Sequence, residues 1–577
     1  MLLREGALHI INDNSLDKIP DILREIMIKR GLREEEFKEF LSLSPQLAYD
    51  PFLLTGMREG IDLITKTIDE GGKIVIYGDY DVDGVTSVAL MVRALRTLDA
   101  NVDYYIPSRI SEGYGLNKEA IKNLKDEGYA LLISVDCGVV SLEETKYAHS
   151  LGLNTIITDH HNPGDEIAEG IIINPKLIGD EYPFKGLAGV GVAYKFICAL
   201  KTVKTIPRKT IVDLLELVAL GTIADLMPLI DENRTIVKYG LNLMRKSSNL
   251  GISKLIEVSG IKKDKLNAMD ISFKIAPRIN AAGRINDASI GVKLLLTEDE
   301  DIALKLANRL NEINNERREF QDFAHNQCME KAKYEIKNGD FLFIEAENCH
   351  EGILGIVAGH IKDKLKRPAV IVQKIDEENE GKKIYKGTGR STGNVNLYEM
   401  LNENSDLLLK FGGHSMACGF TIEEENIKEL KNRLNMDLKA MLEKDETLLS
   451  NEIPVDLDID SKDVSLELAH DLKYLEPCGK GNPEPIFRLN NAELKSFRTV
   501  GNSGEHAIFD ADNIRCVYFN FDRDIYENLL SKNAKSAYDI IGHIDINEWN
   551  DTENVQLRVL KLIESESIRE VDSKSVR

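Results

Sequence analysis

Residues 73–84 read KIVIYGDYDVDG, and this stretch decides the fold. Its first half is a short apolar run rich in β-branched residues, which is typical of a buried strand. Three aspartates follow at alternate positions, Asp79, Asp81 and Asp83, and a helix is predicted to begin at about Gly84. Alternate side chains of an extended chain share a face, so the sequence predicts three converging carboxylates just past the end of a strand.

The alternation of strand and helix continues outward from this stretch. Further short buried strands, separated by amphipathic helices, are predicted at 101–108, 130–138 and 154–161. This pattern predicts an α/β fold with an open parallel sheet that has helices on both faces. Because ligands of such sheets bind at the carboxyl ends of the strands, we expect the functional site at that edge.

Beyond residue 235 the pattern changes. A helical region ends in a long amphipathic helix over 300–336, which is expected to act as a rigid spacer. A smaller α/β region with strands near 340–346 and 368–373 follows, and then short β-like runs that predict an antiparallel barrel of the OB type. The expected parts are an N-terminal appendage that is mainly helical (1–55), a parallel-sheet domain (56–235), a helical connector (236–338), a smaller α/β domain (339–446), an OB-type barrel (450–565) and a charged tail (566–577).

Composition excludes several classes of protein. The chain has 577 residues and a formal net charge of −23, so it is not coated with positive charge, although local basic clusters can still bind phosphates. The seven cysteines stand singly without a CxxC pair, which argues against a disulfide framework or a zinc knuckle. No signal peptide or membrane span is recognisable. We therefore expect a cytoplasmic protein with no membrane partner.

Four segments carry candidate metal ligands, and each is expected to follow a strand: 78–84, SVDCG at 134–138, TDHH at 158–161 and GTIAD at 221–225. Taken singly, such an Asp is usually a helix N-cap and such a His pair a surface turn. So many at the same end of their strands instead predict a common site, where packed carboxylates require a cation. Asp and neutral His favour Mn²⁺ or Mg²⁺ over Zn²⁺ or Co²⁺. Two such ions bridged by one carboxylate would generate a hydroxide and clamp a phosphoryl oxygen.

Together these motifs resemble those of the DHH phosphoesterase superfamily, named for Asp159-His160-His161. Within it the chain is most similar to RecJ-type single-strand-specific exonucleases. That closer likeness rests on APRINAAGR (276–284), on segments similar to the DHHA1 domain at 350–361, 387–392 and 411–419, and on EPCGKGNPEPIF (476–487), which resembles the start of the RecJ OB-type domain. It implies that the parts at 56–235, 339–446 and 450–565 are a DHH domain, a DHHA1 domain and an OB-type nucleic-acid-binding domain.

The resemblance implies a role for each acidic and histidine residue. Asp136 is expected to bridge two ions, whereas Asp79 is either a ligand or a residue behind the ligands. Asp159 is expected to orient a ligand histidine, and His161 to contact the scissile phosphate. Some relatives carry a histidine where this chain has Tyr77, so one metal site is expected to be more open. The implied metal ligands are Asp79, Asp81, Asp83, Asp136, His160 and Asp225, and the implied catalytic residues are Asp136, Asp159, His160 and His161.

The same comparison suggests contacts to nucleic acid. Arg109 is expected to bind a terminal phosphate, unless it is a plain surface arginine, and His350 to face the active site across the interdomain cleft. The 276–284 stretch is expected to be turn-prone, with arginines that fork onto phosphate or pair an acid. The segments 387–392 and 411–419 are expected to be a Gly-rich anion nest and a Gly-Gly turn, or else two ordinary turns. The candidates are Arg109, Arg278, Asn280, Arg284, His350, Arg390, Ser391, Gly412, Gly413 and His414.

The implied activity is that of a metal-dependent 5′→3′ exonuclease that degrades single-stranded DNA to mononucleotides in DNA repair and recombination. Its implied cofactors are two Mn²⁺ or Mg²⁺ ions, and its implied partners are single-strand-binding protein and a RecQ-type helicase. The strand would thread between the DHH and DHHA1 domains, and the barrel would hold it upstream. Two alternatives stay open: another DHH phosphoesterase, such as a nanoRNA or cyclic-dinucleotide hydrolase, and an inactive replication scaffold. The barrel argues against the first, and the four intact motifs argue against the second.

Overall fold

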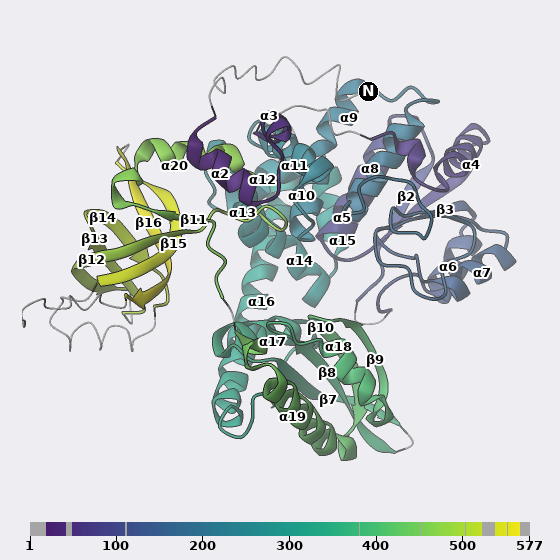
Figure 1. Cartoon of the computed structure of the whole chain (residues 1–577). Helices are drawn as coiled ribbons and strands as arrows, with labels where there is room; N and C mark the ends of the chain where they lie inside the picture. The colour runs from purple at the N-terminus through teal and green to yellow at the C-terminus, as the bar shows by residue number, and fades with distance from the viewer. Residues whose placement is uncertain are drawn as a thin grey trace, which may run out of the picture.

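The computed structural model describes most of the chain as two α/β domains and a barrel (Figure 1). The long helix α16 (Glu300–Glu335) runs from the first α/β domain into the second, and the barrel lies to one side of the first. The described residues are 19–41, 49–109, 112–247, 249–379, 381–450, 452–501, 504–521, 537–550 and 552–565. The predicted tail at 566–577 lies outside them.

The first domain is built on a fully parallel sheet with the strand order β2-β1-β3-β4-β5. The prediction of a parallel sheet is therefore confirmed. One edge strand was not predicted, because three residues make too short a run to recognise. The strands are β1 (Lys73–Gly78), β2 (Val102–Tyr105), β3 (Tyr129–Val135), β4 (Asn154–Thr158) and β5 (Ile171–Ile173).

Helices cover both faces of this sheet and continue into the connector. Helix α5 (Val82–Arg96) is buried along nearly its whole length, because it packs against the sheet on one side and against α8, α10 and α15 on the other. Its central apolar side chains, such as Leu90, each contribute about 1.5–3 kcal/mol by leaving water. The remaining helices are α4 (Met57–Asp69), α6 (Lys118–Asp126), α7 (Leu142–Ser150), α8 (Gly189–Leu200), α9 (Arg208–Asp213), α10 (Leu215–Ala224), α11 (Asp231–Met244), α12 (Leu250–Val258), α13 (Ala268–Asp270), α14 (Ala276–Ile285) and α15 (Ser289–Leu296).

Two stretches of this domain differ from the sequence prediction. GTIAD was expected to follow a strand, but it is the end of helix α10, with Asp225 as its C-cap. The helix is apolar all round since it is buried on every side, and periodicity cannot distinguish such a helix from a buried strand. APRINAAGR was expected to be turn-prone but forms helix α14, which tolerates Pro277 because proline suits the first turn of a helix.

The second domain has a mixed sheet with the order β6-β7-β8-β10-β9, in which only β6 and β7 are parallel. The segments 387–392 and 411–419, expected as a loop and a turn, lie largely in strands β8 and β9–β10. The ring of Phe420 covers Gly387, where a Cβ atom would lie 2.2 Å from it, so this glycine makes room for packing. The elements are β6 (Leu342–Ala346), α17 (Glu351–Leu365), β7 (Ala369–Asn379), β8 (Lys382–Arg390), α18 (Leu397–Glu403), β9 (Leu408–His414), β10 (Ala417–Glu423) and α19 (Ile427–Lys444).

The C-terminal strands close into a barrel, as predicted, but the pairing of β14 with β16 is parallel and not antiparallel as expected. Strand β12 pairs with both β13 and β15, which closes the ring through β14 and β16. The strands are β11 (Leu457–Ile459), β12 (Phe487–Val500), β13 (His506–Ala511), β14 (Ile514–Tyr518), β15 (Ala537–Trp549) and β16 (Thr552–Glu564), and helix α20 (Leu466–Leu472) packs on β15 and β16.

The two N-terminal helices among the described residues belong to the barrel's core. Helices α2 (Asp21–Lys29) and α3 (Phe37–Leu41) share one hydrophobic cluster with the barrel strands. Leu23 of α2 and Phe509 of β13 are both fully buried in this cluster. Residues from the two ends of the sequence therefore stabilise one another.

Arg234 on α11 joins the barrel side of the molecule to the first domain. Its guanidinium donates hydrogen bonds to five backbone carbonyls and lies 3.9 Å from the centre of the Phe40 ring. It is only 4% exposed, and burial lowers its pKa to about 10. The accepting carbonyls, at 2.9–3.4 Å, are those of Phe40, Tyr474, Leu475, Glu476 and Pro477.

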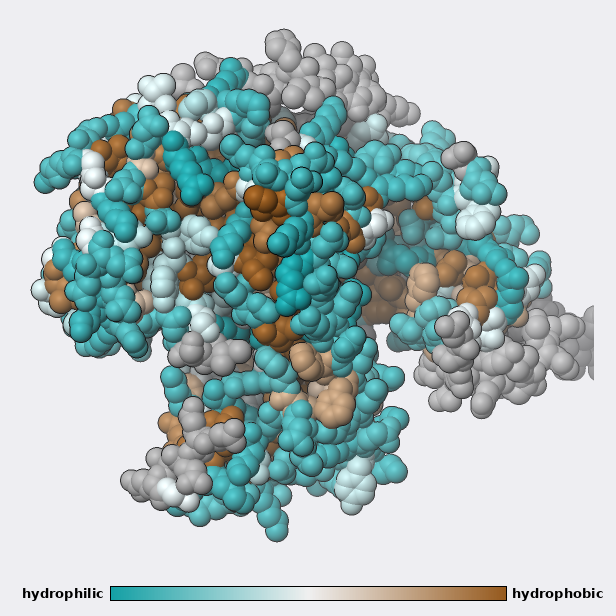
Figure 2. All heavy atoms as spheres, turned by 180° about the vertical axis from the view of Figure 1, so that it is seen from behind, coloured by the Kyte–Doolittle hydropathy of each residue, from teal (hydrophilic) through white to brown (hydrophobic). Residues whose placement is uncertain are grey.

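Seen from behind, the surface is mostly hydrophilic, and hydrophobic side chains gather along the helices in the centre of that face (Figure 2). Within the described ranges, no helix is both long enough and apolar enough to cross a membrane.

Replacing Arg234 with Met should detach the barrel from the first domain. Met keeps much of the apolar stem but leaves several buried carbonyls without a donor, which costs about 3 kcal/mol or more. We expect earlier thermal unfolding and faster proteolysis at the polar segment 445–455. Arg433→Met is the matched control, since Arg433 forms only exposed ion pairs and its loss should cost less than about 1 kcal/mol. Equal stability of the two variants would contradict the role of Arg234.

Candidate metal centre and phosphate contacts

Three neighbouring strands bring acidic residues to one edge of the first sheet. Strands β1, β3 and β4 end level with one another, because Gly78 pairs with Val135, and Val135 with Thr158. The next residue after each strand is an aspartate: Asp79, Asp136 and Asp159. These carboxylates therefore meet at the carboxyl end of the sheet, where the sequence placed the site.

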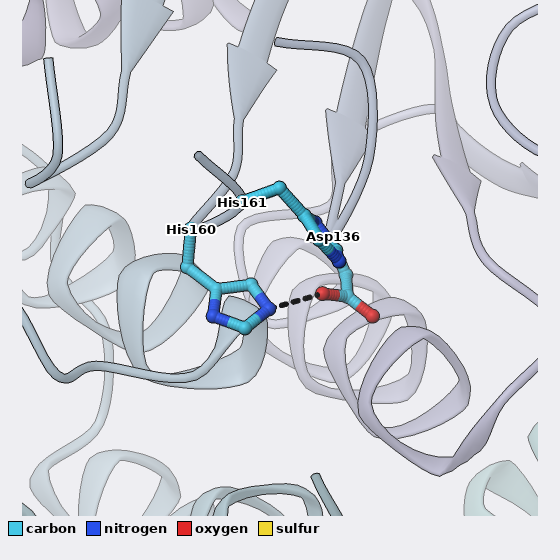
Figure 3. Close-up of side chains that lie close together, drawn as sticks. All are labelled: Asp136, His160 and His161. Atoms are coloured by element: carbon cyan, nitrogen blue, oxygen red, sulfur yellow. Dashed lines mark ion pairs between the residues drawn. The ribbon is translucent and has the colours of Figure 1, made fainter. Parts of the chain in front are cut away.

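Six predicted metal ligands come together at this edge. His160 Nε2 lies 3.1 Å from Asp136 Oδ1 (Figure 3). It also lies 3.7 Å from Asp83 Oδ2 and 3.6 Å from Asp225 Oδ2. Three groups have ligand atoms that all lie within 4.8 Å of one another: Asp79, Asp81 and Asp136; Asp83, His160 and Asp225; and Asp136, His160 and His161. Asp79 thus stands among the possible ligands, and Asp136 occurs in two of the groups.

The three aspartates of the first motif were expected to share one face of an extended chain, but they do not. Asp79 follows the strand, Asp81 is the N-cap of α5 and accepts a hydrogen bond from Gly84 N at 3.0 Å, and Asp83 lies in the first helical turn. They converge because the chain turns into the helix at Asp81. Asp83 accepts hydrogen bonds from Gly189 N and Val190 N, at 2.7 and 2.9 Å, at the N-terminus of α8.

Asp136 is held in a strained conformation between its neighbours. Its φ is 61°, in the left-handed region, which costs a non-glycine residue about 1–3 kcal/mol. Its N–H donates to Thr158 O at 3.0 Å, which keeps it at the end of β4. A Cβ atom on Gly189 would lie 2.4 Å from Asp136 Oδ1, so only glycine lets helix α8 approach this closely.

The electrostatics of the cluster fit a divalent cation. Burial first, and then neighbouring carboxylates, raise the pKa of Asp83 and Asp136 well above the usual range and that of Asp225 to about 6. Burial and the charge of His161 lower the pKa of His160 to about 3, so its ring is neutral. Asp136 Oδ1 and both ring nitrogens of His160 are buried without an aligned hydrogen bond among the described residues. Unpaired carboxylate oxygens beside a neutral imidazole are the donors that Mn²⁺ or Mg²⁺ accepts.

Asp159 pairs with His161 rather than with His160. Asp159 Oδ1 lies 2.8 Å from His161 Nδ1, and its Oδ2 accepts a hydrogen bond from Val139 N at 2.9 Å. Burial lowers the pKa of His161, but the hydrogen bond and charge of Asp159 outweigh it and raise that pKa to about 9. His161 is therefore positively charged at neutral pH in the metal-free protein. Tyr114, which the sequence did not point to, has its hydroxyl 3.3 Å from His161 Nδ1.

Arginines gather on the Asp81 side of the cluster. Burial, followed by the charges of Arg109, Arg317 and Arg390, lowers the pKa of Arg284 to about 10, while the charge of Asp81 acts in the opposite direction. Arg109 stacks over Tyr80, with its Cζ 5.1 Å from the ring centre. These four arginines form no ion pair with an acid in the part of the chain that the structure describes. We call them the arginine cluster; like-charged groups held this way are suited to an anion.

Both α/β domains contribute residues to the arginine cluster. Arg284 donates from Nη1 to Gly352 O at 3.0 Å, which links α14 to the start of α17. His350 caps α17 and stacks on Phe320, and its pKa is lowered by burial and by the charge of Arg109, so it lies on the same side. Arg317 was missed because an arginine in a long amphipathic helix gives no local signal.

The other predicted phosphate contacts lie on several different elements. Arg278 donates to Lys274 O and Asn311 Oδ1, Asn280 accepts from Val82 N at the start of α5, and Ser391 donates to Val395 O. The remaining three, Gly412, Gly413 and His414, lie on the exposed edge strand β9. Tyr77 is buried in the core with its hydroxyl on Gly115 O, and it belongs to none of the ligand groups.

Comparison with known proteins agrees with this geometry. Family models match residues 73–222 (DHH family, N-terminal domain), 338–440 (DHHA1 domain) and 455–561 (RecJ OB domain). The chain is 38% identical to the single-stranded-DNA-specific exonuclease RecJ of Bacillus subtilis, over 94% of this chain and 68% of that protein. It is 33% identical to the RecJ of Escherichia coli, over 94% of this chain and 95% of the relative. The chain belongs to the RecJ family.

A solved RecJ structure confirms the fold. The crystal structure of RecJ from Thermus thermophilus in complex with Mn²⁺ matches with a TM-score of 0.81 and 30% identity, over 95% of this chain and 76% of that chain. The resemblance drawn from the motifs is thus confirmed. The likeness to RecJ extends through the barrel. A smaller DHH hydrolase, which was the first alternative, would not require this barrel.

Mn²⁺ binding should release protons, and more of them at pH 6 than at pH 8. Asp225 has a raised pKa of about 6, so it is about half protonated at pH 6 and must lose that proton to become a ligand. Affinity for Mn²⁺ should therefore be weaker at pH 6. Calorimetric titration in two buffers of different ionisation enthalpy measures the release. Asp225→Asn is the control that removes this difference, and a pH-independent release in the unchanged protein would contradict the assignment.

Proposed function

We propose that the six converging residues hold two divalent ions and make this chain a single-stranded-DNA-specific exonuclease. Membership of the RecJ family supports the activity. The observation that carries the site is the group of buried atoms at the centre of the ligand groups, Asp136 Oδ1 and the two ring nitrogens of His160, which have no aligned hydrogen bond among the described residues.

The ligand groups suggest how the ions would be divided. Asp79, Asp81 and Asp136 would hold one ion, and Asp83, His160 and Asp225 the other, with Asp136 between them. Bound there, Mn²⁺ or Mg²⁺ would supply Lewis acidity that lowers the pKa of water and offsets charge on the phosphoryl oxygens. The family structure with Mn²⁺ supports this choice of metal.

The residues around the centre would orient the scissile phosphate. His161, kept positively charged by Asp159, would donate a hydrogen bond to a phosphoryl oxygen and stabilise charge that develops there. Tyr114 beside it would limit the positions that the His161 ring can adopt. The oxygen of a water molecule would form the new bond to phosphorus and lose a proton. The bond from phosphorus to the 3′-oxygen of the terminal nucleotide would break, and that oxygen would take up a proton.

The arginine cluster would set the polarity of the enzyme. It lies beside Asp81 and contains guanidinium groups from both α/β domains, so a terminal 5′-phosphate bound there would place the next phosphate over the ligand groups. Hydrolysis would then release one 5′-mononucleotide and leave a strand that again ends in a 5′-phosphate. This arrangement supports 5′→3′ degradation.

In the cell we propose a role in DNA repair and recombination in the cytoplasm. Single-strand-binding protein and a RecQ-type helicase are the proposed partners, since an enzyme restricted to single strands needs another protein to expose and present them. The support for these partners is the family resemblance alone.

A digest of labelled DNA tests the activity. With Mn²⁺, the protein should release mononucleotides from single strands and leave blunt duplex intact, and chelation by EDTA should abolish release. Asp136→Asn should lower the rate at least about 10³-fold, since removing a ligand shared by both ions removes the charge that stabilises the transition state. Equal digestion of duplex would contradict strand selectivity, and an active Asp136→Asn variant would contradict the metal assignment.

Substitution in the arginine cluster tests polarity. Arg109→Gln should lower kcat/KM about 10–100-fold on a 5′-phosphorylated strand, because a charged hydrogen bond worth about 1.5–3 kcal/mol is lost. On a 5′-hydroxyl strand the loss should be smaller, since the terminal phosphate is missing there. Arg96→Gln, on the last turn of α5, is the control. An equal loss on the two substrates would contradict a terminal-phosphate site.

A further inference from the structure

Two lysines lie near Asp225, whereas the arginine cluster lies near Asp81. Lys176 follows β5 in the first domain, and Lys480 lies in the segment that leads into the barrel. Neither ammonium group has an ion pair or hydrogen bond within the described ranges, although the chain carries a large excess of acidic residues. Two unpaired cations in such a chain need an explanation.

Lys176 is fixed to the His161 loop through Asn174. The fully buried Asn174 donates from Nδ2 to His161 O at 2.9 Å, and its Oδ1 accepts from Lys176 N at 2.8 Å. One side chain therefore sets both the loop that carries the histidines and the backbone of Lys176. The Lys176 side chain is only partly exposed.

Lys480 is fixed to the loop that follows Asp225. Leu229 N donates to Lys480 O at 2.7 Å, which ties the barrel segment to a residue four positions beyond Asp225. Gly479 packs on Leu229 so closely that a Cβ atom there would lie 2.8 Å from the Leu229 side chain. Figure 1 shows this yellow-green segment reaching from the barrel onto the helices of the first domain.

The Lys480 segment is rigid as well as close. Asn482 is buried and donates from Nδ2 to Leu475 O and Pro477 O, both at 2.8 Å, and Arg234 holds the same carbonyls from the other side. Lys480 is exposed between these fixed points. Its position relative to Asp225 is therefore set by the backbone.

Both lysines act electrostatically on Asp225, and each on the other. The charges of Lys176 and Lys480 counteract the rise in the pKa of Asp225. Burial lowers the pKa of Lys176, and Lys480 lowers it further, whereas Asp225 and Asp159 oppose this. Together with the contacts through Asn174 and Leu229, these interactions place both lysines near Asp225.

We propose that Lys176 and Lys480 form a second phosphate-binding site, which holds the strand on the 3′ side of the scissile phosphate. This inference rests on the proposed function. The terminal phosphate lies in the arginine cluster and the scissile phosphate over the ligand groups, so the next phosphates pass the lysines on their way to the barrel. Lys480 belongs to the segment that leads there, so the site joins the metal centre to the barrel.

The length of the substrate tests this site. A 5′-phosphorylated dinucleotide has only a terminal and a scissile phosphate, whereas a 12-mer has phosphates beyond them. For the double variant Lys176→Gln/Lys480→Gln we expect kcat/KM to fall about 10-fold on the 12-mer, as two phosphate contacts are lost, and clearly less on the dinucleotide. An equal loss of kcat/KM on the dinucleotide and the 12-mer would place the effect at Asp225 and overturn the proposal. An unchanged kcat/KM on the 12-mer would also overturn it.

Salt dependence gives a second, independent measurement. In EDTA, fluorescence anisotropy with the 12-mer gives the slope of log K against log salt, and each lost phosphate contact on a single strand should reduce that slope by about 0.7. In the double variant this slope should be smaller by about 1.4, whereas in Lys176→Arg/Lys480→Arg it should be unchanged. Lys462→Gln, an exposed lysine 3.0 Å from Asp460, is the matched control. An unchanged slope in the double variant overturns the proposal.

These outcomes are separate from failure of the proposed function. If the unchanged protein degrades the 12-mer with Mn²⁺ but not after Asp136→Asn, the proposed function stands whatever the lysine variants do. If it degrades no single strand, the proposed function itself fails. The salt slope is measured without catalysis and still decides whether the lysines bind the strand.

Discussion

Repulsion between buried carboxylates is the constraint on which the rest of this structure depends. Two unit charges 4 Å apart interact with about 4 kcal/mol at the effective dielectric near a protein surface. The charges of Asp79, Asp81, Asp83 and Asp225 all act on the buried Asp136. That energy exceeds the approximately 1 kcal/mol that a helix cap contributes. Capping alone therefore cannot account for so many acids at the edge of one sheet. The backbone N–H groups of α8 neutralise part of this charge at Asp83, and cations must neutralise the rest.

The surrounding charges are arranged in relation to this acidic centre. The chain carries a net charge of −23, yet its arginine cluster and its two central lysines form no ion pairs with acids among the described residues. Basic groups that stay unpaired in an acidic protein are available to a polyanion. Binding of DNA would then depend on a few local contacts, and the acidic remainder of the surface would disfavour binding elsewhere.

Most of the fold and the clustering of the candidate metal ligands could be predicted from sequence, because both follow from local patterns. Short apolar runs identified β1, β3 and β4, and the residue after each strand identified Asp79, Asp136 and Asp159. Helix α10 was mistaken for a strand, since a helix buried on all sides has no polar face. Tyr114, Arg317, Lys176 and Lys480 could not be found, because each reaches the site through tertiary contacts such as Leu229 N to Lys480 O. Arg278 and Ser391, which were also proposed to bind phosphate, make hydrogen bonds within the protein that the sequence did not indicate.

The shared core of α2, α3 and the barrel has a consequence for how the protein is made. Leu23, Ile26 and Met27 leave the ribosome early, but their packing partners, such as Phe487 and Phe509, lie more than four hundred residues later in the chain. Contacts of such long sequence separation form late, after the intervening domains have folded around their own cores. Until then α2 presents its apolar face to water. A chain truncated before the barrel would leave that face exposed permanently, so α2 would direct an incomplete product to aggregation or removal.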